Sequence, residues 1–208
     1  MAADAVGEDQ LRRLLAVMHA LRAGCPWDRE QTHVSLLHYL VEETAEVVDA
    51  VETGTDDDLR EELGDLLLQI AFHSEIASER DAFDIDDVAR GISEKLIARH
   101  PHVFAGQEAP ADLNVVWEQR KKVEKKRDSS LDGIPVSLPV LARANKVIMR
   151  ARSHDVPLDL PTEPIDEAAV GTELLALASR AQASGIDPEH ALRAALRDLE
   201  SSIRAEGR

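Results

Sequence analysis

The sequence contains little cysteine, few aromatic residues and no long apolar run. Cys25 is the single cysteine in 208 residues, so no internal disulfide can form and we expect a reducing cytoplasm. No apolar run approaches the roughly 18 residues of a membrane-spanning helix. The first ten residues also lack the charged and apolar regions of a secretion signal. We therefore expect a cytoplasmic protein without a membrane partner.

Positive charge is also scarce. The formal net charge is −16, which argues against nucleic acid or an anionic membrane as a partner for the whole surface. A small anionic molecule can still bind if a metal ion and a few local cations receive it. Apolar residues make up 44% of the chain, and this is enough for a packed core. The composition therefore favours a globular protein and leaves room for a small anionic ligand.

No segment shows the two-residue period of a β-strand, and Ala and Leu favour helix. Periodicity and capping residues predict helices over 8–23, 35–52, 56–80, 85–99, 113–127, 139–152, 166–184 and 188–205. Thr55 and Asp84 are the expected N-caps of two of them. The segment 24–34 reads as an ordered loop. The expected fold class is all-α, a helical bundle.

Composition changes after Arg127, where proline becomes frequent. We expect a helical domain over 1–130, a proline-rich connector with one short helix over 131–165, and a helical pair over 166–208. The run Gly64–Ile70 resembles Gly171–Leu177. The C-terminal pair is either a shortened copy that lacks the acidic residues or a chance similarity between Leu- and Ala-rich helices.

Two acidic clusters lie on neighbouring predicted helices. They comprise Glu42, Glu43 and Glu46 on the first helix, and Glu62 and Asp65 on the second. Residues three or four apart share a helix face, so Glu43 with Glu46 and Glu62 with Asp65 form carboxylate pairs. Pressing the pairs together costs roughly 4 kcal/mol per close pair at an effective dielectric of about 20. A hard divalent cation with oxygen ligands removes that penalty.

The helical wheel places these acids near apolar stripes. On the first helix Glu43 and Glu46 border the stripe of Leu36, Leu40, Val47, Val48 and Val51, while Glu42 turns outward. The second helix is apolar on almost every side, so we expect it to be central, with Glu62 and Asp65 at least partly buried. Buried carboxylates are paired, protonated or metal-bound. The alternative is a solvated or salt-bridged face.

Two cations extend an apolar stripe on the helix 85–99. Lys95 and Arg99 continue the line of Ile85, Val88, Ile92 and Leu96 instead of lying opposite it. Cations on an inward face suit phosphate oxygens. The alternative is that both side chains snorkel to water. Together with metal-bound carboxylates, these cations make a receptor for a metal–polyphosphate.

Several motifs in order resemble the MazG-type nucleoside triphosphate pyrophosphohydrolases. The run Gly24–Asp28 (GCPWD), with Gln31–His33 (QTH), resembles their loop signature. The acidic residues match their E-E-x-x-E…E-x-x-D pattern, with 15 residues between Glu46 and Glu62. The segments Arg99–Phe104, Trp117–Lys121 and Leu131–Pro139 also resemble the family. The match covers about residues 10–150.

The resemblance implies an all-α fold of the NTP pyrophosphohydrolase type, assembled as a homodimer. It implies Mg²⁺ as cofactor and hydrolysis of an NTP or dNTP between the α- and β-phosphates, in nucleotide-pool house-cleaning. Carried across by position, the metal ligands are Glu43, Glu46, Glu62 and Asp65, and Glu42 or Glu46 is the catalytic base. The substrate-binding residues are Lys95, Arg99, Trp117 and Lys121.

Two other readings stay open from the residues alone. A metal–nucleotide sensor would bind the same ligand without turnover, and a helical scaffold would carry the acids incidentally. Cys25, beside a proline, reads as structural rather than nucleophilic. Trp27 reads as a core plug rather than a base-stacking group. The histidines show no compact metal spacing, and the lysine-rich helix 113–127 reads as a solvated face.

Overall fold

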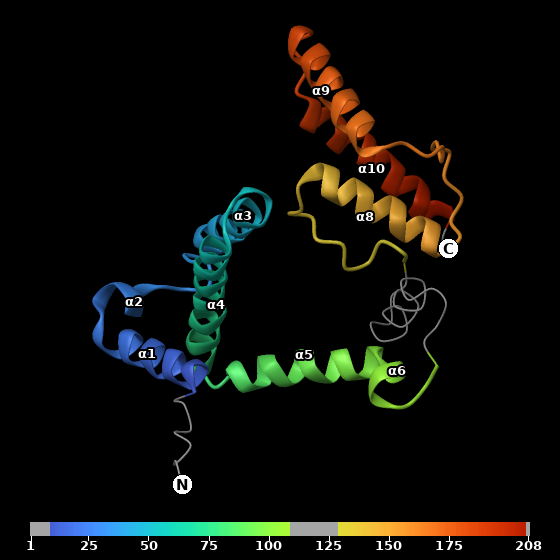
Figure 1. The fold of residues 1–208 in the computed structure, drawn as a ribbon. Coiled ribbons are helices and arrows are strands. Elements are labelled where there is room, and N and C mark those ends of the chain that lie inside the picture. Colours follow the sequence, from blue (N-terminus) through green and yellow to red (C-terminus); the bar gives the residue numbers. More distant parts are fainter. Residues whose placement is uncertain (1–8, 109–128, 207–208) are drawn as a thin grey trace. The chain divides into compact units, whose positions relative to one another are not determined.

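A computed structural model describes residues 9–108 and 129–206, and these contain helices and no strand. The chain divides into two compact units, Met1–Gly106 and Gln107–Arg208. Figure 1 shows the helices: α1 Gln10–Gly24, α2 Pro26–Glu30, α3 Leu37–Thr53, α4 Asp56–Ser78, α5 Ile85–Arg99, α6 Pro101–Phe104, α8 Val140–Ser153, α9 Glu167–Ala183 and α10 Pro188–Glu206. The all-α prediction is confirmed for the described residues. The predicted helix 113–127 lies outside them.

The caps set the helix borders that matter for the site. Thr55 is the N-cap of α4, and its backbone N–H donates to Asp58 Oδ2 at 2.8 Å in a capping box. Asp84 caps α5 in a second capping box, in which its Oδ1 accepts from the Asp87 N–H at 2.9 Å. Each side chain satisfies a backbone donor that the first helical turn leaves free. Both predicted caps are confirmed.

The segment 24–34 differs from the predicted loop because it contains the short helix α2. Pro26 stands in its first turn, where a missing N–H costs nothing. The buried guanidinium of Arg22 holds the segment, because it donates to the backbone oxygens of Asp28 and Gln31 and to the carboxylate of Glu79. α1 and α4 therefore share one anchor for this segment.

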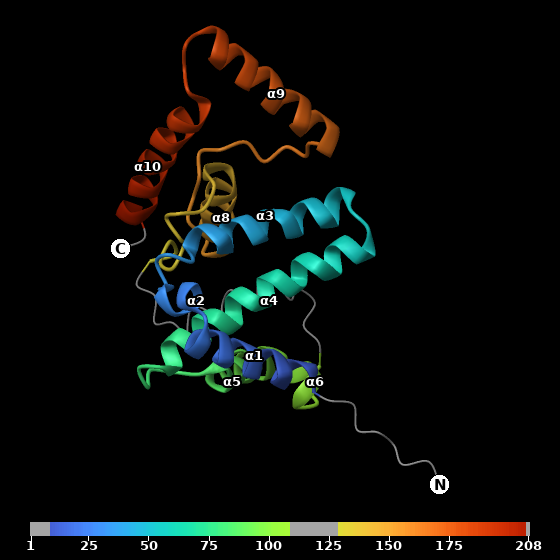
Figure 2. The same ribbon diagram turned by 90° about the vertical axis from the view of Figure 1, so that its left-hand side faces the viewer.

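The first unit is built around α4, which packs against α1, α3 and α5. Met18, Leu36 and Phe72 form its buried cluster, with Tyr39, Leu68 and Ile76 packed against them. α3 and α4 run in opposite directions and lie side by side as a hairpin (Figures 1 and 2). The predicted central position of α4 is thus confirmed.

The hairpin also leaves apolar residues uncovered. Val48, Val51, Leu63 and Ile70 are 42–66% exposed, although the helical wheel placed Val48 and Val51 in the stripe that bounds the site. Only the part of each stripe that meets the other helix or α1 is buried. Because exposed apolar surface is costly in water, this face is suited to contact another protein surface.

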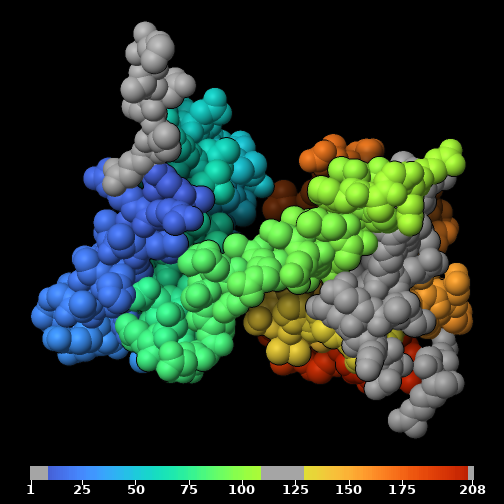
Figure 3. Space-filling model, turned by 90° about the horizontal axis from the view of Figure 1, so that it is seen from below, coloured from blue at the N-terminus to red at the C-terminus, as the bar shows by residue number. Residues whose placement is uncertain are grey.

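Helix α5 leaves the C-terminal end of α4 and runs across it rather than back along it (Figures 1 and 2). In the space-filling view α5 projects from the helices that precede it in the chain (Figure 3). Its stripe is consequently not buried within the first unit, since Val88, Ile92 and Leu96 are 39–48% exposed. The inward face expected for α5 is therefore not found within this chain's described residues.

The second unit has a separate core. Val140, Val147 and Ala151 of α8 are buried with Leu196 and Ile203 of α10. Arg143 also donates to Glu200 at 2.9 Å across these two helices. The helix of the expected connector 131–165 thus packs against a helix of the expected segment 166–208. The three-part division of the chain stays a prediction.

Among the described helices, none is long and apolar enough to cross a membrane. The single cysteine, Cys25, is a free thiol of intermediate burial. These two observations leave the cytoplasmic location a prediction.

Candidate metal centre

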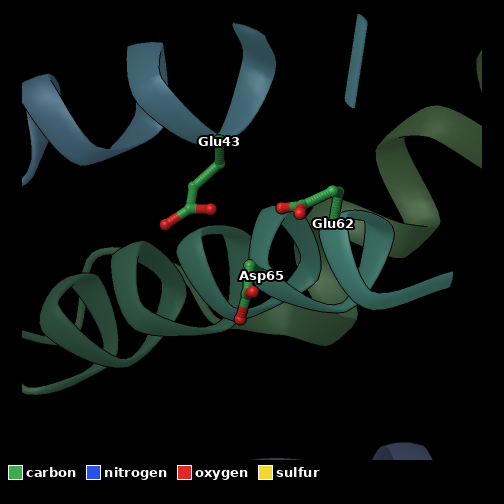
Figure 4. A group of neighbouring side chains, drawn as sticks. All are labelled: Glu43, Glu62 and Asp65. Atoms are coloured by element: carbon green, nitrogen blue, oxygen red, sulfur yellow. The ribbon is translucent and has the colours of Figure 1, made fainter. Parts of the chain in front are cut away.

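Three carboxylates converge where α3 and α4 face each other. Glu43 comes from α3, and Glu62 and Asp65 come from α4 (Figure 4). One oxygen of each residue lies within 4.8 Å of an oxygen of the other two. The spacing within α4 is local, because residues three apart share a face. The approach of Glu43 depends on the tertiary contact between the helices.

The turn between the helices holds this arrangement. Gly54 is the C-cap of α3, and a Cβ at this position would stand 2.8 Å from Ala50 Cα. A larger residue would therefore push the chain away from α3 just before Thr55 starts α4. The tight turn allows α4 to run back along α3, so that Glu62 and Asp65 come level with Glu43.

The three carboxylates repel one another when all of them are ionised. Partial burial raises the pKa of Glu43, and the nearby charges of Asp65, Glu46 and Glu62 raise it further. Desolvation likewise raises the pKa of Glu62, followed by the charges of Glu46 and Asp65. Both glutamates are half-buried. The site therefore favours a bound proton or a bound cation over three bare carboxylates.

Glu46 and Glu42 have different positions from the group of three. Glu46 is exposed and is not among the three converging residues, yet it is close enough to accept or share a hydrogen bond with Glu43. Glu42 is exposed, as the helical wheel predicted. The structure thus brings together three of the four predicted ligands and leaves Glu46 at their edge.

The predicted phosphate-binding cations are not beside these carboxylates in one chain. Lys95 and Arg99 are half-buried on α5, where they continue the line of the exposed apolar stripe. Measured along the helix axes, Asp65 lies about 20 Å before the C-terminal end of α4, and Lys95 lies about 15 Å beyond the start of α5. Because α5 runs across α4 and does not fold back along it, Lys95 does not return to the level of Asp65 (Figure 1). The predicted residues Trp117 and Lys121 lie outside the described residues.

Two polar residues of α4 continue the face of Asp65, and the sequence reading missed both. Gln69 is one turn further along and is 5% exposed, and its Oε1 has no hydrogen-bond partner among the described residues. His73 is one turn beyond, and its Nδ1 lies 2.8 Å from His33 Nδ1. The four-residue spacing from Asp65 was the signal available in the sequence.

Arg80 fixes the tautomers of this histidine pair. Its guanidinium, which can only donate, lies 3.2 Å from His33 Nε2, so that nitrogen accepts. His33 Nδ1 then carries the hydrogen and donates to His73 Nδ1. His73 must carry its own hydrogen on Nε2, which is buried without a partner among the described residues. Burial and the neighbouring His33 lower the pKa of His73.

The donor set fits a hard divalent cation. The three residues offer only carboxylate oxygens, and no histidine or cysteine joins them among the described residues. Oxygen ligands suit Mg²⁺, Mn²⁺ and Ca²⁺ rather than thiophilic metals. Around octahedral Mg²⁺ adjacent oxygen ligands stand about 3 Å apart and opposite ones about 4.2 Å, and the three oxygens here lie within 4.8 Å of one another. The arrangement can therefore hold a divalent metal ion after little adjustment.

The helical hairpin and its carboxylate group define a class, an all-α protein with a carboxylate cluster that can hold a divalent cation. The model of the MazG nucleotide pyrophosphohydrolase domain matches residues 31–104, which include all five acidic residues of the two clusters. A Thermotoga maritima protein named nucleoside triphosphate pyrophosphohydrolase/pyrophosphatase MazG is 38% identical over 206 residues, covering 88% of this chain and 80% of that protein. This chain belongs to the MazG family.

Two further relatives show how far the similarity extends. The nucleoside triphosphate pyrophosphohydrolase of Escherichia coli is 47% identical over 150 residues, 68% of this chain and 57% of that protein. An uncharacterised 26.1 kDa protein of Streptomyces cacaoi is 44% identical over 201 residues, 94% of this chain and 82% of that protein. The chain thus spans little more than half of the Escherichia coli relative.

Proposed function

We propose that this protein hydrolyses nucleoside triphosphates between the α- and β-phosphates, in a Mg²⁺-dependent reaction that gives the monophosphate and pyrophosphate. The convergence of Glu43, Glu62 and Asp65 across the α3–α4 hairpin is the observation that carries the proposal. The names of the relatives and the family match support the reaction type. A house-cleaning role in the nucleotide pool follows from the same similarity.

Each acidic residue has a distinct proposed role. Glu43, Glu62 and Asp65 hold the Mg²⁺, and Glu46 joins them from the edge of the group. A bound Mg²⁺ supplies positive charge to the phosphates and lowers the pKa of bound water. The carboxylates fix the position of the phosphates relative to α3 and α4. Without a metal ion, the same group repels the polyphosphate.

The proton of the attacking water goes to a carboxylate that is not fully engaged as a ligand. Glu46 and Glu42 are the two exposed acids beside the group. Glu46 is the better placed base, since its charge reaches both Glu43 and Glu62. Water then attacks phosphorus in line and the phosphoanhydride bond to the leaving group breaks, without a covalent enzyme intermediate.

Lys95 and Arg99 stabilise the phosphate charge from a second copy of the chain. Within one chain α5 carries them away from the carboxylates (Figure 1). The exposed apolar residues of α3, α4 and α5 support a homodimer that covers these faces. In such a dimer, α5 of one copy lies against the α3–α4 hairpin of the other. Trp117 and Lys121 keep their proposed role in substrate binding.

Pyrophosphate release from a panel of NTPs and dNTPs with Mg²⁺, with the products identified, tests the reaction. We expect release that disappears with EDTA and in Glu62→Ala, while Glu52→Ala, an exposed acid of the same hairpin, retains it. Tight nucleotide binding without release in the wild-type protein would identify a sensor instead. No binding and no Mg²⁺-dependent thermal shift would favour a scaffold.

Mixing two inactive variants tests the shared site. Glu62→Ala lacks a ligand and Lys95→Ala lacks a cation. After co-refolding, half of the dimers contain one chain of each kind, with one intact site out of two. Activity should return to about one quarter of the wild-type level. If each chain forms its own site, the mixture stays inactive.

A further inference from the structure

Half of this chain's aromatic side chains meet at one place. The sequence has six aromatic residues, and Trp27, Tyr39 and Phe72 from α2, α3 and α4 lie together. The Trp27 ring stands edge-on to Tyr39 at 6.1 Å and to Phe72 at 6.5 Å between centroids. The His38 ring lies 3.8 Å from the Tyr39 ring. We call Trp27, Tyr39 and Phe72 the aromatic site.

The aromatic site is only partly a core. Phe72 is 3% exposed and belongs to the buried cluster, but Trp27 is 50% exposed. The expected role of Trp27 as a core plug is therefore wrong. An indole left half in water loses much of the free energy that its burial would provide. The exposed indole beside Tyr39 offers a flat surface for another aromatic ring.

The aromatic site lies beside the metal centre. Tyr39 is one turn before Glu43 on α3, so the two share a face at a rise of about 6 Å. Phe72 is two turns after Asp65 on α4, on the face that meets α3. The two helices thus lead from the carboxylates to the aromatic rings on the same side. A nucleoside covers this separation between its inner phosphates and its base.

Gln69 lies between the two sites. It is one turn from Asp65 and three residues from Phe72, and its Oε1 is buried without a partner among the described residues. A buried amide oxygen left without a donor is unfavourable, which marks this side chain for a ligand or a rearranged contact. A carboxamide has both donors and an acceptor, and a base edge presents the same groups.

We propose that the aromatic site and Gln69 form the nucleobase subsite of the NTP. The base stacks on the exposed face of Trp27 beside Tyr39, and the Gln69 carboxamide hydrogen-bonds its edge. The inference rests on the proposed function, because the phosphates must lie at the carboxylates. In this subsite Trp27 contributes affinity for every base, since stacking accepts any base, and Gln69 determines which base binds best.

Binding of two probes separates the subsite from the metal centre. The first is inorganic tripolyphosphate, and the second is a set of non-hydrolysable α,β-methylene NTPs with the four bases, all with Mg²⁺. In Trp27→Leu we expect NTP-analogue binding to weaken by about tenfold. Tripolyphosphate binding should stay within about twofold, because it has no base to stack. Phe104→Leu, another exposed aromatic substitution, is the matched control and should change neither.

Gln69 is tested by the order of affinities among the four bases. Gln69→Leu should bring the four Kd values together, while tripolyphosphate binding is retained. Gln69→Glu replaces the donors of the amide by acceptors and should change which base binds best. This second variant keeps the shape of the side chain, so it tests the proposal even if the leucine variant does not fold.

The outcomes distinguish the two proposals. If tripolyphosphate does not bind the wild-type protein with Mg²⁺, the proposed function fails. If it binds but Trp27→Leu and Gln69→Glu leave the NTP affinities and their order unchanged, the subsite alone is wrong. Loss of both probes together with a changed oligomeric state in Trp27→Leu would show that the aromatic site is an interface between copies, which also overturns the subsite.

Discussion

Removing one metal ligand should stabilise the metal-free protein. Glu43 and Asp65 place carboxylate oxygens within 4.8 Å of each other. At that separation two unit charges repel by about 0.9 kcal/mol in bulk water and about 3.5 kcal/mol at an effective dielectric of 20. Because both groups are half-buried and reached by water, the lower end applies. Glu43→Gln should raise the free energy of unfolding by about 1 kcal/mol in EDTA at pH 8 and low salt.

Mg²⁺ should make the wild-type protein more stable than Glu43→Gln, the reverse of the order in EDTA. A ligand that binds only the native state at 100 times its Kd adds about 2.7 kcal/mol of stability. Wild-type protein should gain this with Mg²⁺, while Glu43→Gln should gain far less. Urea unfolding followed by circular dichroism, with and without Mg²⁺, measures both effects. Asp49→Asn removes an exposed charge of α3 away from the group and serves as the control.

The repulsion among the carboxylates also predicts how stability depends on pH and salt. The pKa of Glu43 is raised in the folded state, so the native protein binds more protons than the unfolded chain above the ordinary glutamate pKa. The contribution of Glu43 to the stability of the metal-free protein therefore falls as the pH rises through that window. The advantage of Glu43→Gln should vanish near pH 4 and shrink in 1 M salt. A variant that is less stable than wild type in EDTA at low salt would refute the reasoning.

Three further predictions concern the rest of the first unit. Arg22→Ala should lower the free energy of unfolding by about 3 kcal/mol, because Glu79 and two backbone oxygens lose their hydrogen-bond donor. The control Arg12→Ala, at the exposed start of α1, should barely change the free energy of unfolding. If the proposed homodimer forms, Val51→Lys should give a monomer by light scattering, and Glu52→Lys beside it should not. The contribution of His73 to stability should be lost as the pH drops below about 6.5, because the pKa of His73 is lowered on folding, and His73→Gln should remove that part of the pH dependence.

Local chemistry accounts for the parts of the fold that the sequence predicted well. The caps Thr55 and Asp84 and the turn at Gly54 fixed the borders of α3, α4 and α5 within a few residues. Periodicity likewise gave α8, α9 and α10. The short helices α2 and α6 were missed, since one or two turns with a leading proline carry too little pattern to distinguish them from loops.

Helical spacing predicted some features of the candidate site, and others required the tertiary structure. The pairing of Glu62 with Asp65 follows from helical spacing alone and needed no tertiary information. The exposure of Trp27, Val48 and the α5 stripe could not be read from a helical wheel, because a wheel shows which residues share a face and not what covers it. The buried oxygen of Gln69 appears only in the tertiary structure, because burial depends on what packs over α4.

The amino-acid sequence by itself determined the helices, their ends and the acidic face of each helix, because these depend on residues within a turn or two. The tertiary structure decided that Glu43 of one helix approaches Glu62 and Asp65 of the next, that Glu46 stays at the edge, and that α5 leads Lys95 and Arg99 away. Those outcomes depend on how whole helices pack and on which of their apolar faces find a partner.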